Sequence, residues 1–376
     1  MSVRLLHTSD VHLGATFKVL GERGRDQHRQ LRDTFARVIT LALEEQVDAV
    51  LIAGDLFDSV PAARVQLPFA AEQFARLGEA RIPACVIAGN HDPLGEGGAS
   101  LWRDLQARCP DLAVFGPHLE ARTFPERDLT VVGRSVTGEL SAESPLVGLP
   151  VSRRTRHLVG LAHGSVQRPD LPARFGLITP EEIGASGVDY LALGDWHSAR
   201  DLSSGGVVAW YSGSPEMIDV DQIDSGSVCL VTLRAPGDRE VVRRQVGRRH
   251  AGRLALDLAT AGGLEGVVRE IRARADPDAA LLVTLAGLAR LGDRVNVERI
   301  REELASEFFR LEIRDESHLR TEAIEPSQYP ENTVIGRFVR QLYEQIASRD
   351  GDARAIAEDA LSYGVMLLEG KEDVLA

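Results

Sequence analysis

Five short polar clusters, each directly after a run of apolar residues with high β-propensity, constrain this chain more than any other feature. They occupy positions 10–12, 54–58, 89–92, 163–164 and 194–197, and read Asp-Val-His, Gly-Asp-Leu-Phe-Asp, Gly-Asn-His-Asp, His-Gly and Gly-Asp-Trp-His. Open α/β sheets bind ligands just outside the carboxyl ends of their strands. Carboxylate, amide and imidazole groups at such an edge are suited to divalent first-row metal ions. The sequence therefore predicts an α/β sheet that carries a metal site.

The runs that precede these clusters are predicted to be buried strands, at residues 3–8, 47–53, 83–88, 157–162 and 188–193. Between the first three strands, residues 27–45 and 62–78 have the periodicity of helices. A helical crossover between neighbouring strands makes those strands parallel, so their carboxyl ends meet at one edge. The first half of the chain is expected to be α/β.

The residue types favour two ions rather than one. Asp10 and His12 flank Val11, an alternation that lets a strand end present two groups to a single ion. Asp55 has two carboxylate oxygens and can bridge a pair of ions. The remaining predicted ligands are Asn90, His163, Asp195 and His197. Two ions roughly 3.5–4 Å apart can hold both the attacking and the leaving oxygen of a phosphate ester.

The order of the clusters resembles the calcineurin-like metallophosphoesterase superfamily, whose pattern is Asp-x-His, Gly-Asp-x-x-Asp, Gly-Asn-His-Asp/Glu, a lone His and Gly-His-x-His. More narrowly, residues 6–14, 32–35 and 48–58 resemble the SbcD-type DNA-repair nucleases. The chain length and residues 360–370 resemble the YhaO-type exonuclease proteins. The resemblance implies a layered α/β/β/α sandwich with a small α+β capping domain and C-terminal helices. It is strongest over residues 1–235.

For the site, the resemblance implies two divalent ions, with Mn²⁺ preferred and Mg²⁺ as the alternative. One ion would be held by Asp10, His12, Asp55 and His197, and the other by Asp55, Asn90, His163 and Asp195. His91 would bind no ion; it would pair with Asp58 and stabilise or protonate the leaving oxygen of the substrate. A carboxylate partner fixes the tautomer of an imidazole and favours its protonated form.

One position departs from the family pattern, because Asp195 stands where most members have the first histidine of Gly-His-x-His. Aspartate binds Mn²⁺ and Mg²⁺ well, so a loaded site is expected, with a preference shifted toward harder ions or a weaker second ion. The neighbouring Trp196 is interpreted as a packing residue at the end of a strand. Stacking on a nucleic-acid base is the alternative.

A basic stretch follows the first cluster, where a polyanionic substrate would approach the ions. It consists of Lys18, Arg23, Arg25, His28, Arg29 and Arg32. Two interpretations remain open, a DNA-binding surface and a solvated helix face. The net charge of −13 argues against nonspecific coating of nucleic acid by the whole protein surface, but it is compatible with a local basic groove.

Other conspicuous residues receive structural interpretations. We expect His7 to be a core residue, Asp92 to orient its loop, and Ser212 to lie in a turn rather than act as a nucleophile. The cysteines have no Cys-x-x-Cys spacing and are expected to be reduced; they are Cys85, Cys109 and Cys229. No apolar run is long enough to span a bilayer, so we expect no membrane association and a cytoplasmic protein.

The chain is predicted to have four parts: a catalytic domain at 1–235, an α+β capping domain at 250–315, a linker at 316–333, and C-terminal helices within 334–376. The capping domain reads as βαβαβ, and the last two helices are predicted at 334–346 and 355–368. Their apolar stripes either pack on the same protein or bind a partner. The resemblance favours a partner, an SbcC-like coiled-coil ATPase, and it also leads us to expect a homodimer.

Three functions fit these observations. The leading hypothesis is a two-metal-dependent phosphodiesterase that acts on DNA, as an exonuclease or endonuclease in DNA repair, together with an ATPase. The first alternative is a phosphodiesterase or phosphatase of small molecules such as cyclic nucleotides. The second alternative is a weakly catalytic scaffold that regulates a partner ATPase.

Overall fold

The computed structural model describes residues 2–17, 20, 22–95, 97–138, 143–168, 176–235, 237–258, 260–289, 297–319 and 324–370. The chain divides into two compact units, Met1–Ala251 and Gly252–Ala376. Within the described residues, the first unit contains two six-stranded sheets, and the largest sheet of the second unit has three strands.

The first sheet of the N-terminal unit has the strand order β12-β11-β1-β2-β3-β4. Its strands are β1 (Val3–Thr8), β2 (Ala49–Ala53), β3 (Ala84–Ile87), β4 (Leu112–Val114), β11 (Ser227–Leu233) and β12 (Arg239–Gln245). From β1 to β4 neighbouring strands are parallel, whereas β11 is antiparallel to both of its neighbours. The parallel pairing predicted for the first three strands is confirmed. Strand β12 extends this unit beyond residue 235.

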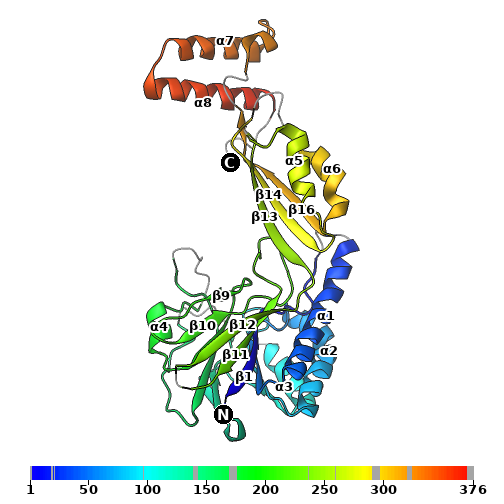
Figure 1. Ribbon diagram of the computed structural model, residues 1–376, viewed down its shortest axis with the longest axis vertical. Helices are drawn as coiled ribbons and strands as arrows, with labels where there is room; N and C mark the ends of the chain where they lie inside the picture. The colour runs from blue at the N-terminus through cyan, green and yellow to red at the C-terminus, as the bar shows by residue number, and fades with distance from the viewer. Residues whose placement is uncertain are drawn as a thin grey trace. The chain divides into compact units, whose positions relative to one another are not determined.

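Three helices cover one face of this sheet: α1 (Glu22–Glu44), α2 (Val60–Glu79) and α3 (Gly98–Arg108) (Figure 1). Helix α2 begins after Ser59, whose side chain accepts a hydrogen bond from the backbone N–H of Ala62. Phe35 of α1 and Phe74 of α2 pack with Val50 of β2 in one buried cluster. Each such side chain stabilises the fold by roughly 1.5–3 kcal/mol relative to its exposed state.

The second sheet has the strand order β5-β6-β7-β8-β10-β9. Its strands are β5 (Glu120–Phe124), β6 (Leu129–Gly133), β7 (His157–His163), β8 (Tyr190–Gly194), β9 (Arg200–Asp201) and β10 (Val208–Tyr211). The four inner strands are parallel, and the two edge strands are antiparallel to their neighbours. The 3₁₀ turn η2 (Pro125–Arg127) connects β5 to β6.

The two sheets pack face to face, because successive side chains of a strand point to opposite faces. In β2, Val50 and Ile52 lie in the cluster under the helices, whereas Leu51 lies in a second cluster with Val159 and Tyr190 of the other sheet. Helix α4 (Pro180–Ala185) covers the outer face of the second sheet through buried Ile183. The predicted α/β/β/α layering is confirmed.

The second unit contains the alternation of strands and helices that the sequence predicts. Its main sheet has the order β13-β14-β16, and β14 and β16 are parallel. The elements are β13 (His250–Asp257), α5 (Gly263–Arg272), β14 (Ala279–Ala286), β15 (Leu288–Ala289), α6 (Val297–Leu304), η4 (Ala305–Glu307), β16 (Arg310–Asp315) and β17 (His318–Leu319). Apolar residues of both helices, including Ile271 and Ile300, pack with Val283 of the sheet.

The C-terminal helices α7 (Val334–Ala347) and α8 (Gly351–Leu368) form a hairpin. Their apolar stripes pack against each other in a buried cluster, which also includes Ile324 and Tyr329 from the segment predicted as a linker. The helices approach closely at Gly364, where an added Cβ would lie 2.0 Å from the ring of Phe338. The 3₁₀ turn η6 (Pro326–Gln328) precedes the hairpin. In the described part of the chain, no helix has the length and apolarity needed to cross a membrane.

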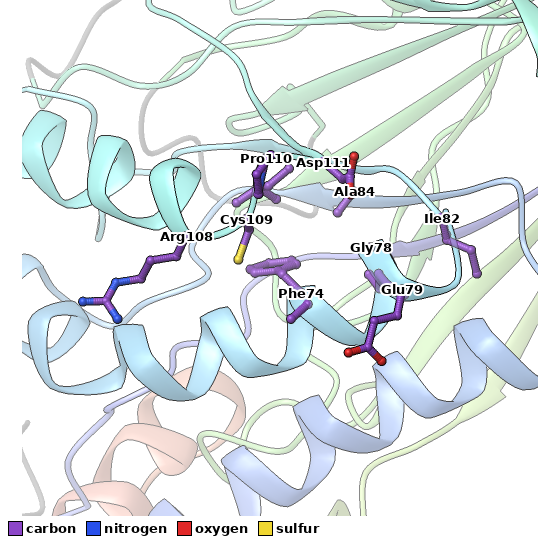
Figure 2. A pocket seen from close by; sticks show the side chains of 12 residues that line it. Phe74, Gly78, Glu79, Ile82, Ala84, Arg108, Cys109, Pro110 and Asp111 are labelled. Carbon is purple, nitrogen blue, oxygen red and sulfur yellow. The ribbon is translucent and has the colours of Figure 1, made fainter.

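A pocket of about 200 Å³ opens in the first unit beside the start of β3 (Figure 2). It is lined by apolar and charged side chains, among them Phe74, Ile82, Arg108, Cys109 and Asp111. Ala84, the first residue of β3, also lines it, whereas the polar cluster at 89–92 follows the last residue of that strand. The pocket and the predicted metal site are therefore at opposite ends of β3.

Candidate metal centre

All five polar clusters lie at the carboxyl ends of strands: after β1, β2 and β3 in the first sheet, and at the ends of β7 and β8 in the second. Within the described residues, seven non-glycine residues have positive φ, and four of them are predicted ligands: Asp10 (52°), His12 (50°), Asp55 (52°) and Asp195 (108°). This conformation is costly for residues with a Cβ and is concentrated at functional sites. Strained backbone conformations are thus concentrated at the predicted metal centre.

Two glycines of the motifs make room for ligand side chains. A Cβ added to Gly54, which has a φ of 93°, would lie 2.2 Å from Nδ1 of His163. A Cβ added to Gly89 would lie 2.1 Å from Oδ1 of Asp55. Any larger residue would displace these side chains, which explains the glycine in both Gly-Asp and Gly-Asn.

On one side of the centre, His163 faces two oxygen ligands. Its Nε2 lies 2.9 Å from Oδ1 of Asn90 and 3.4 Å from Oδ2 of Asp55. Its Nδ1 lies 2.8 Å from the carbonyl oxygen of Ala53, which can only accept, so Nδ1 carries the proton of the neutral ring. The lone pair of Nε2 then converges with two acceptor oxygens. Three acceptors without a donor between them fit a cation, and the carbonyl is the usual kind of outer partner for a metal-binding histidine.

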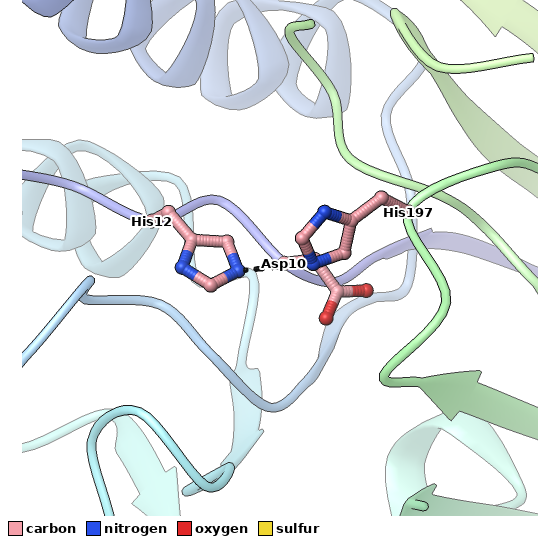
Figure 3. A group of neighbouring side chains, drawn as sticks. All are labelled: Asp10, His12 and His197. Atoms are coloured by element: carbon pink, nitrogen blue, oxygen red, sulfur yellow. Dashed lines mark hydrogen bonds between the residues drawn. The ribbon is translucent and has the colours of Figure 1, made fainter. Parts of the chain in front are cut away.

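On the other side, Asp10, His12 and His197 gather from two different sheets (Figure 3). Nε2 of His12 lies 3.3 Å from Nε2 of His197 and 3.7 Å from Oδ2 of Asp55. Oδ1 of Asp58 lies 3.4 Å from Nδ1 of His12, without the geometry of a hydrogen bond.

Within the described residues, the possible ligand atoms form three overlapping groups, and in each group all atoms lie within 4.8 Å of one another. Two groups consist of predicted ligands, Asp10, His12 and His197 in one and Asp10, Asp55 and His163 in the other; the third consists of His12, Asp58 and His91. Asp10 belongs to both groups of predicted ligands, and Asp55 contacts a histidine of each. The donor set, two buried carboxylates with imidazole and amide groups, fits a pair of divalent ions.

The charges of these buried groups depend strongly on one another. Burial raises the pKa of Asp10 to about 6, although His163 opposes the shift. Burial also acts to raise the pKa of Asp55, but the neighbouring His163 and His12 outweigh it and lower that pKa. Burial acts to lower the pKa of His163, but Asp55 and Asp10 outweigh it and raise that pKa to about 10. The carboxylates thus require positive charge beside them, which protons or bound cations can supply.

His91 and Asp58 are hydrogen-bonded to each other, but the bond uses the backbone carbonyl of Asp58 and not the predicted carboxylate. Nδ1 of His91 bonds the backbone carbonyl of Asp58 at 2.9 Å, whereas the Asp58 carboxylate faces His12. The His91 side chain is exposed, and its ring centroid lies 4.6 Å from that of His12. Motif spacing brings the two residues together, but it cannot distinguish a main-chain partner from a side-chain partner.

Asp195 lies beside the centre with its carboxylate turned to a serine. Its Oδ2 accepts a hydrogen bond of 2.8 Å from Oγ of Ser165, and its backbone N–H donates to Oδ1 of Asp10 at 3.1 Å. The groups of clustered ligand atoms found within the described residues do not include this carboxylate. Its role as a ligand therefore remains a prediction from the sequence.

Sequence reasoning missed three side chains that support the ligands. Ser9 donates to Oδ2 of Asp10 at 2.5 Å, Ser165 holds Asp195, and Nε2 of Gln222 lies 2.6 Å from Nδ1 of His197. The two serines lie within two residues of a polar cluster, a position that could have drawn attention to them. Gln222 is 25 residues from its partner, and no sequence signal connects the two.

The predicted basic stretch lies largely on α1. Its exposed arginines there are Arg23, Arg25, Arg29 and Arg32, and Lys18 lies outside the described residues. Arg29 pairs with Asp26, and the guanidinium of Arg32 lies 4.4 Å from the ring centroid of Phe69. Nδ1 of His28 bonds the carbonyl of Ala15 at 3.2 Å, which fixes the first turns of α1 to the segment that follows His12.

The structural interpretations of three other residues agree with their contacts. The Asp92 carboxylate accepts hydrogen bonds from the backbone N–H groups of Phe57 and Gly89, so it does orient the loop. His7 is fully buried, with Nδ1 2.8 Å from the Tyr190 hydroxyl. Trp196 packs against the core on the outer face of the second sheet.

Comparison with known proteins gives the centre a family context. The calcineurin-like phosphoesterase family matches residues 3–173. The uncharacterized metallophosphoesterase YhaO of Bacillus subtilis is 28% identical over 239 residues, covering 60% of this chain and 56% of that protein. The DNA double-strand break repair protein Mre11 of Halobacterium salinarum is 26% identical over 378 residues, covering 96% of this chain and 90% of that protein.

A third relative is the SbcD component of the nuclease SbcCD of Bacillus subtilis. It is 38% identical over 91 residues, covering 24% of this chain and 22% of that protein. The matched region thus spans just over half the length of YhaO and most of the length of the Halobacterium protein.

Proposed function

Given that this chain carries a calcineurin-like metallophosphoesterase domain, we propose that it hydrolyses phosphodiester bonds in DNA, as an exonuclease or endonuclease of DNA repair. The observation that carries the proposal is that carboxylate and imidazole ligand atoms gather at the carboxyl ends of the strands in groups of three residues, with all atoms of a group within 4.8 Å of one another. Such a centre serves phosphate ester hydrolysis when it holds two divalent ions.

The proposed ligands of one ion are Asp10, His12, Asp55 and His197, and those of the other are Asp55, Asn90 and His163, with Asp195 as the fourth. When bound, the ions would supply charge stabilisation of the phosphate oxygens and an activated nucleophile. Oxygen and imidazole ligands together favour Mn²⁺, with Mg²⁺ as the alternative.

We assign His91 to the leaving oxygen. Its Nδ1 donates to the Asp58 carbonyl, so Nε2 is the nitrogen that remains for the substrate. The side chain is exposed beside His12, at the rim of the centre rather than inside it. A protonated imidazole there would hold or neutralise the negative charge that develops on the leaving oxygen.

Two features favour DNA over a small phosphodiester. The exposed arginines of α1 follow Asp10 and His12 in the chain, and the His28–Ala15 bond fixes that helix to the same segment. Two relatives are by name a DNA double-strand break repair protein and a component of a nuclease. Phosphate contacts from such arginines would make binding fall with increasing salt concentration.

An SbcC-like coiled-coil ATPase is the proposed partner, and a homodimer is the proposed assembly. The α7–α8 hairpin buries its facing stripes but leaves Val334 (73% exposed) and Ile356 (66% exposed) for a partner. A chain that ends before Ser327 should still hydrolyse a small phosphodiester and should lose co-purification with the ATPase. Loss of the hydrolysis as well would show that the hairpin is needed for the catalytic unit.

The test of the activity is one assay series with Mn²⁺ or Mg²⁺. The substrates are bis-p-nitrophenyl phosphate, p-nitrophenyl phosphate, and end-labelled single- and double-stranded DNA. His91→Ala should retain Mn²⁺ binding in calorimetry and lose about 10²–10⁴-fold in turnover. The matched control is His118→Ala, because His118 is also an exposed histidine but lies outside the centre.

Activity on the monoester alone would contradict the nuclease proposal and favour a phosphatase. No activity on any substrate, with Mn²⁺ bound, would favour the scaffold that regulates an ATPase.

A further inference from the structure

Two of the predicted histidine ligands, His163 and His197, differ in what holds their Nδ1 atoms. The partner of His163 is a backbone carbonyl, which can only accept, so the neutral ring carries its proton on Nδ1 and presents the lone pair of Nε2 to the centre. Nδ1 of His12 lies 3.4 Å from Oδ1 of Asp58, without the geometry of a hydrogen bond. His197 has a different partner, the side-chain amide of Gln222, with its nitrogen 2.6 Å from Nδ1.

The orientation of the Gln222 amide follows from its other contacts. Its Oε1 accepts from the backbone N–H groups of Ile218 at 3.0 Å and Asp219 at 3.2 Å. The reversed amide would place an NH₂ group against two N–H donors, so the hydrogen-bond network selects the orientation in which Nε2 faces His197. An amide nitrogen only donates, and therefore Nδ1 of His197 accepts and its neutral ring carries the proton on Nε2.

This tautomer opposes metal binding at His197. Its Nε2–H faces Nε2 of His12 at 3.3 Å, so the two rings share a hydrogen bond at the place where both lone pairs are needed for an ion (Figure 3). An ion on Nε2 of His197 requires the proton on Nδ1, where the Gln222 amide now presents a donor.

We propose that Gln222 is a positioning residue that controls loading of the Asp10–His12–His197 site, an inference that rests on the proposed function. On loading, the proton of His197 leaves Nε2 to solvent and one returns at Nδ1, with no net change in protonation. The amide turns over so that Oε1 accepts from Nδ1–H, and the N–H groups of Ile218 and Asp219 lose their acceptor. Loading of this site is thereby coupled to the 218–222 loop, whereas at the His163 site the carbonyl of Ala53 already holds a proton on Nδ1.

The decisive variant is Gln222→Glu. A carboxylate has two acceptor oxygens, so it can hold the two backbone N–H groups and Nδ1–H at the same time. We expect Mn²⁺ to bind one of its two sites about tenfold more tightly in this variant, the lower end of the effect of an outer partner. The control is Ile223→Glu, which adds the same charge at the next residue, an exposed position.

A second measurement does not depend on charge. In the wild type, Mn²⁺ should accelerate amide hydrogen exchange at Ile218 and Asp219, since both lose their acceptor. In Gln222→Glu, these amides should be insensitive to Mn²⁺. The first measurement reports on Mn²⁺ binding and the second on protection of the loop amides, and neither depends on hydrolysis.

Equal Mn²⁺ affinity in Gln222→Glu and Ile223→Glu, or wild-type exchange at 218 and 219 that does not respond to Mn²⁺, would overturn the role of Gln222 and leave the proposed function intact. If the wild type binds no Mn²⁺, the proposed function fails, and this inference fails with it.

Discussion

The His163 side and the His197 side of the metal centre are built differently. His163 is the last residue of β7, and its Nδ1 is held by the carbonyl of Ala53, the last residue of β2. His197 lies three residues beyond the end of β8, and its Nδ1 is held by a side chain from another loop. One ring is thus fixed by two sheets, and the other by a contact between loops.

The loop that carries Gln222 is itself anchored at one end. Glu216 is buried and accepts hydrogen bonds from the Thr34 hydroxyl of α1 at 2.7 Å and from the backbone N–H groups of Arg248 and Arg249. The start of the loop is therefore fixed, and the part around Gln222 is held through its hydrogen bonds to His197 and to its own backbone. The comparison indicates that the His163 site should bind an ion more tightly than the His197 site.

The largest effect on Mn²⁺ affinity is expected from a substitution at Asp55, which lies between the His163 side and the His197 side. Asp55 contacts His163 and His12 and accepts a hydrogen bond from the backbone N–H of His91. Asp55→Asn removes a buried charge that both ions would share, so Mn²⁺ affinity should fall on the order of 100-fold or more at both sites. Titration calorimetry would measure it. Loss at only one site would show that Asp55 does not bridge.

Replacing each histidine should separate the two sides. His163→Gln removes a ligand whose ring is fixed by the carbonyl of Ala53, and we expect about a 100-fold loss of Mn²⁺ affinity at one site. His197→Gln removes a ring that must first change its tautomer, and we expect only about a tenfold loss. Competitive titration with a Mn²⁺ indicator compares the two variants. Equal losses would contradict the difference between the sides.

Asp195→Asn tests whether that carboxylate binds an ion. An asparagine can still accept the hydrogen bond from Ser165, so an orienting role predicts a small loss of Mn²⁺ affinity, about threefold. Ser165→Ala should give a similar small loss, since it removes the hydrogen bond to the same carboxylate. If Asp195→Asn instead costs as much as His163→Gln, Asp195 is a ligand, as the motif position predicts.

A further prediction concerns the stability of the strands that carry both sides. Burial lowers the pKa of His7 from 6.5 to about 3. Between these values the unfolded chain binds a proton that the folded chain does not, so this contribution to stability is complete above pH 6.5 and is lost as the pH falls. From pH 7 to pH 5, the loss due to His7 should be about 2 kcal/mol.

Urea denaturation of the wild type and of His7→Gln at both pH values would measure this difference. His118→Gln is the control, because His118 is exposed. A wild-type pH dependence that matches that of His7→Gln would contradict the buried neutral state of His7.

Much of the fold could be read from hydrophobic pattern. Strands β1, β2 and β3 and the helices between them were predictable, because a buried parallel strand is a short apolar run and its crossover is helical. The C-terminal helices were predictable for the same reason, but the packing of Phe338 against Gly364 was not. An apolar stripe predicts that one face of a helix will be buried, but it does not predict which part of the protein will pack against that face.

The polar clusters at strand ends were thus determined by the sequence alone, because a sheet edge collects whatever residues follow its strands. What the tertiary structure decided is which atom faces which: the Asp58 carboxylate faces His12, the Asp58 carbonyl accepts from His91, the Asp195 carboxylate accepts from Ser165, and the Gln222 amide contacts His197. Hydrogen-bond donors and acceptors act over about 3 Å. Their pairing depends on side-chain positions that only the packed loops define, and spacing along the chain carries no information about it.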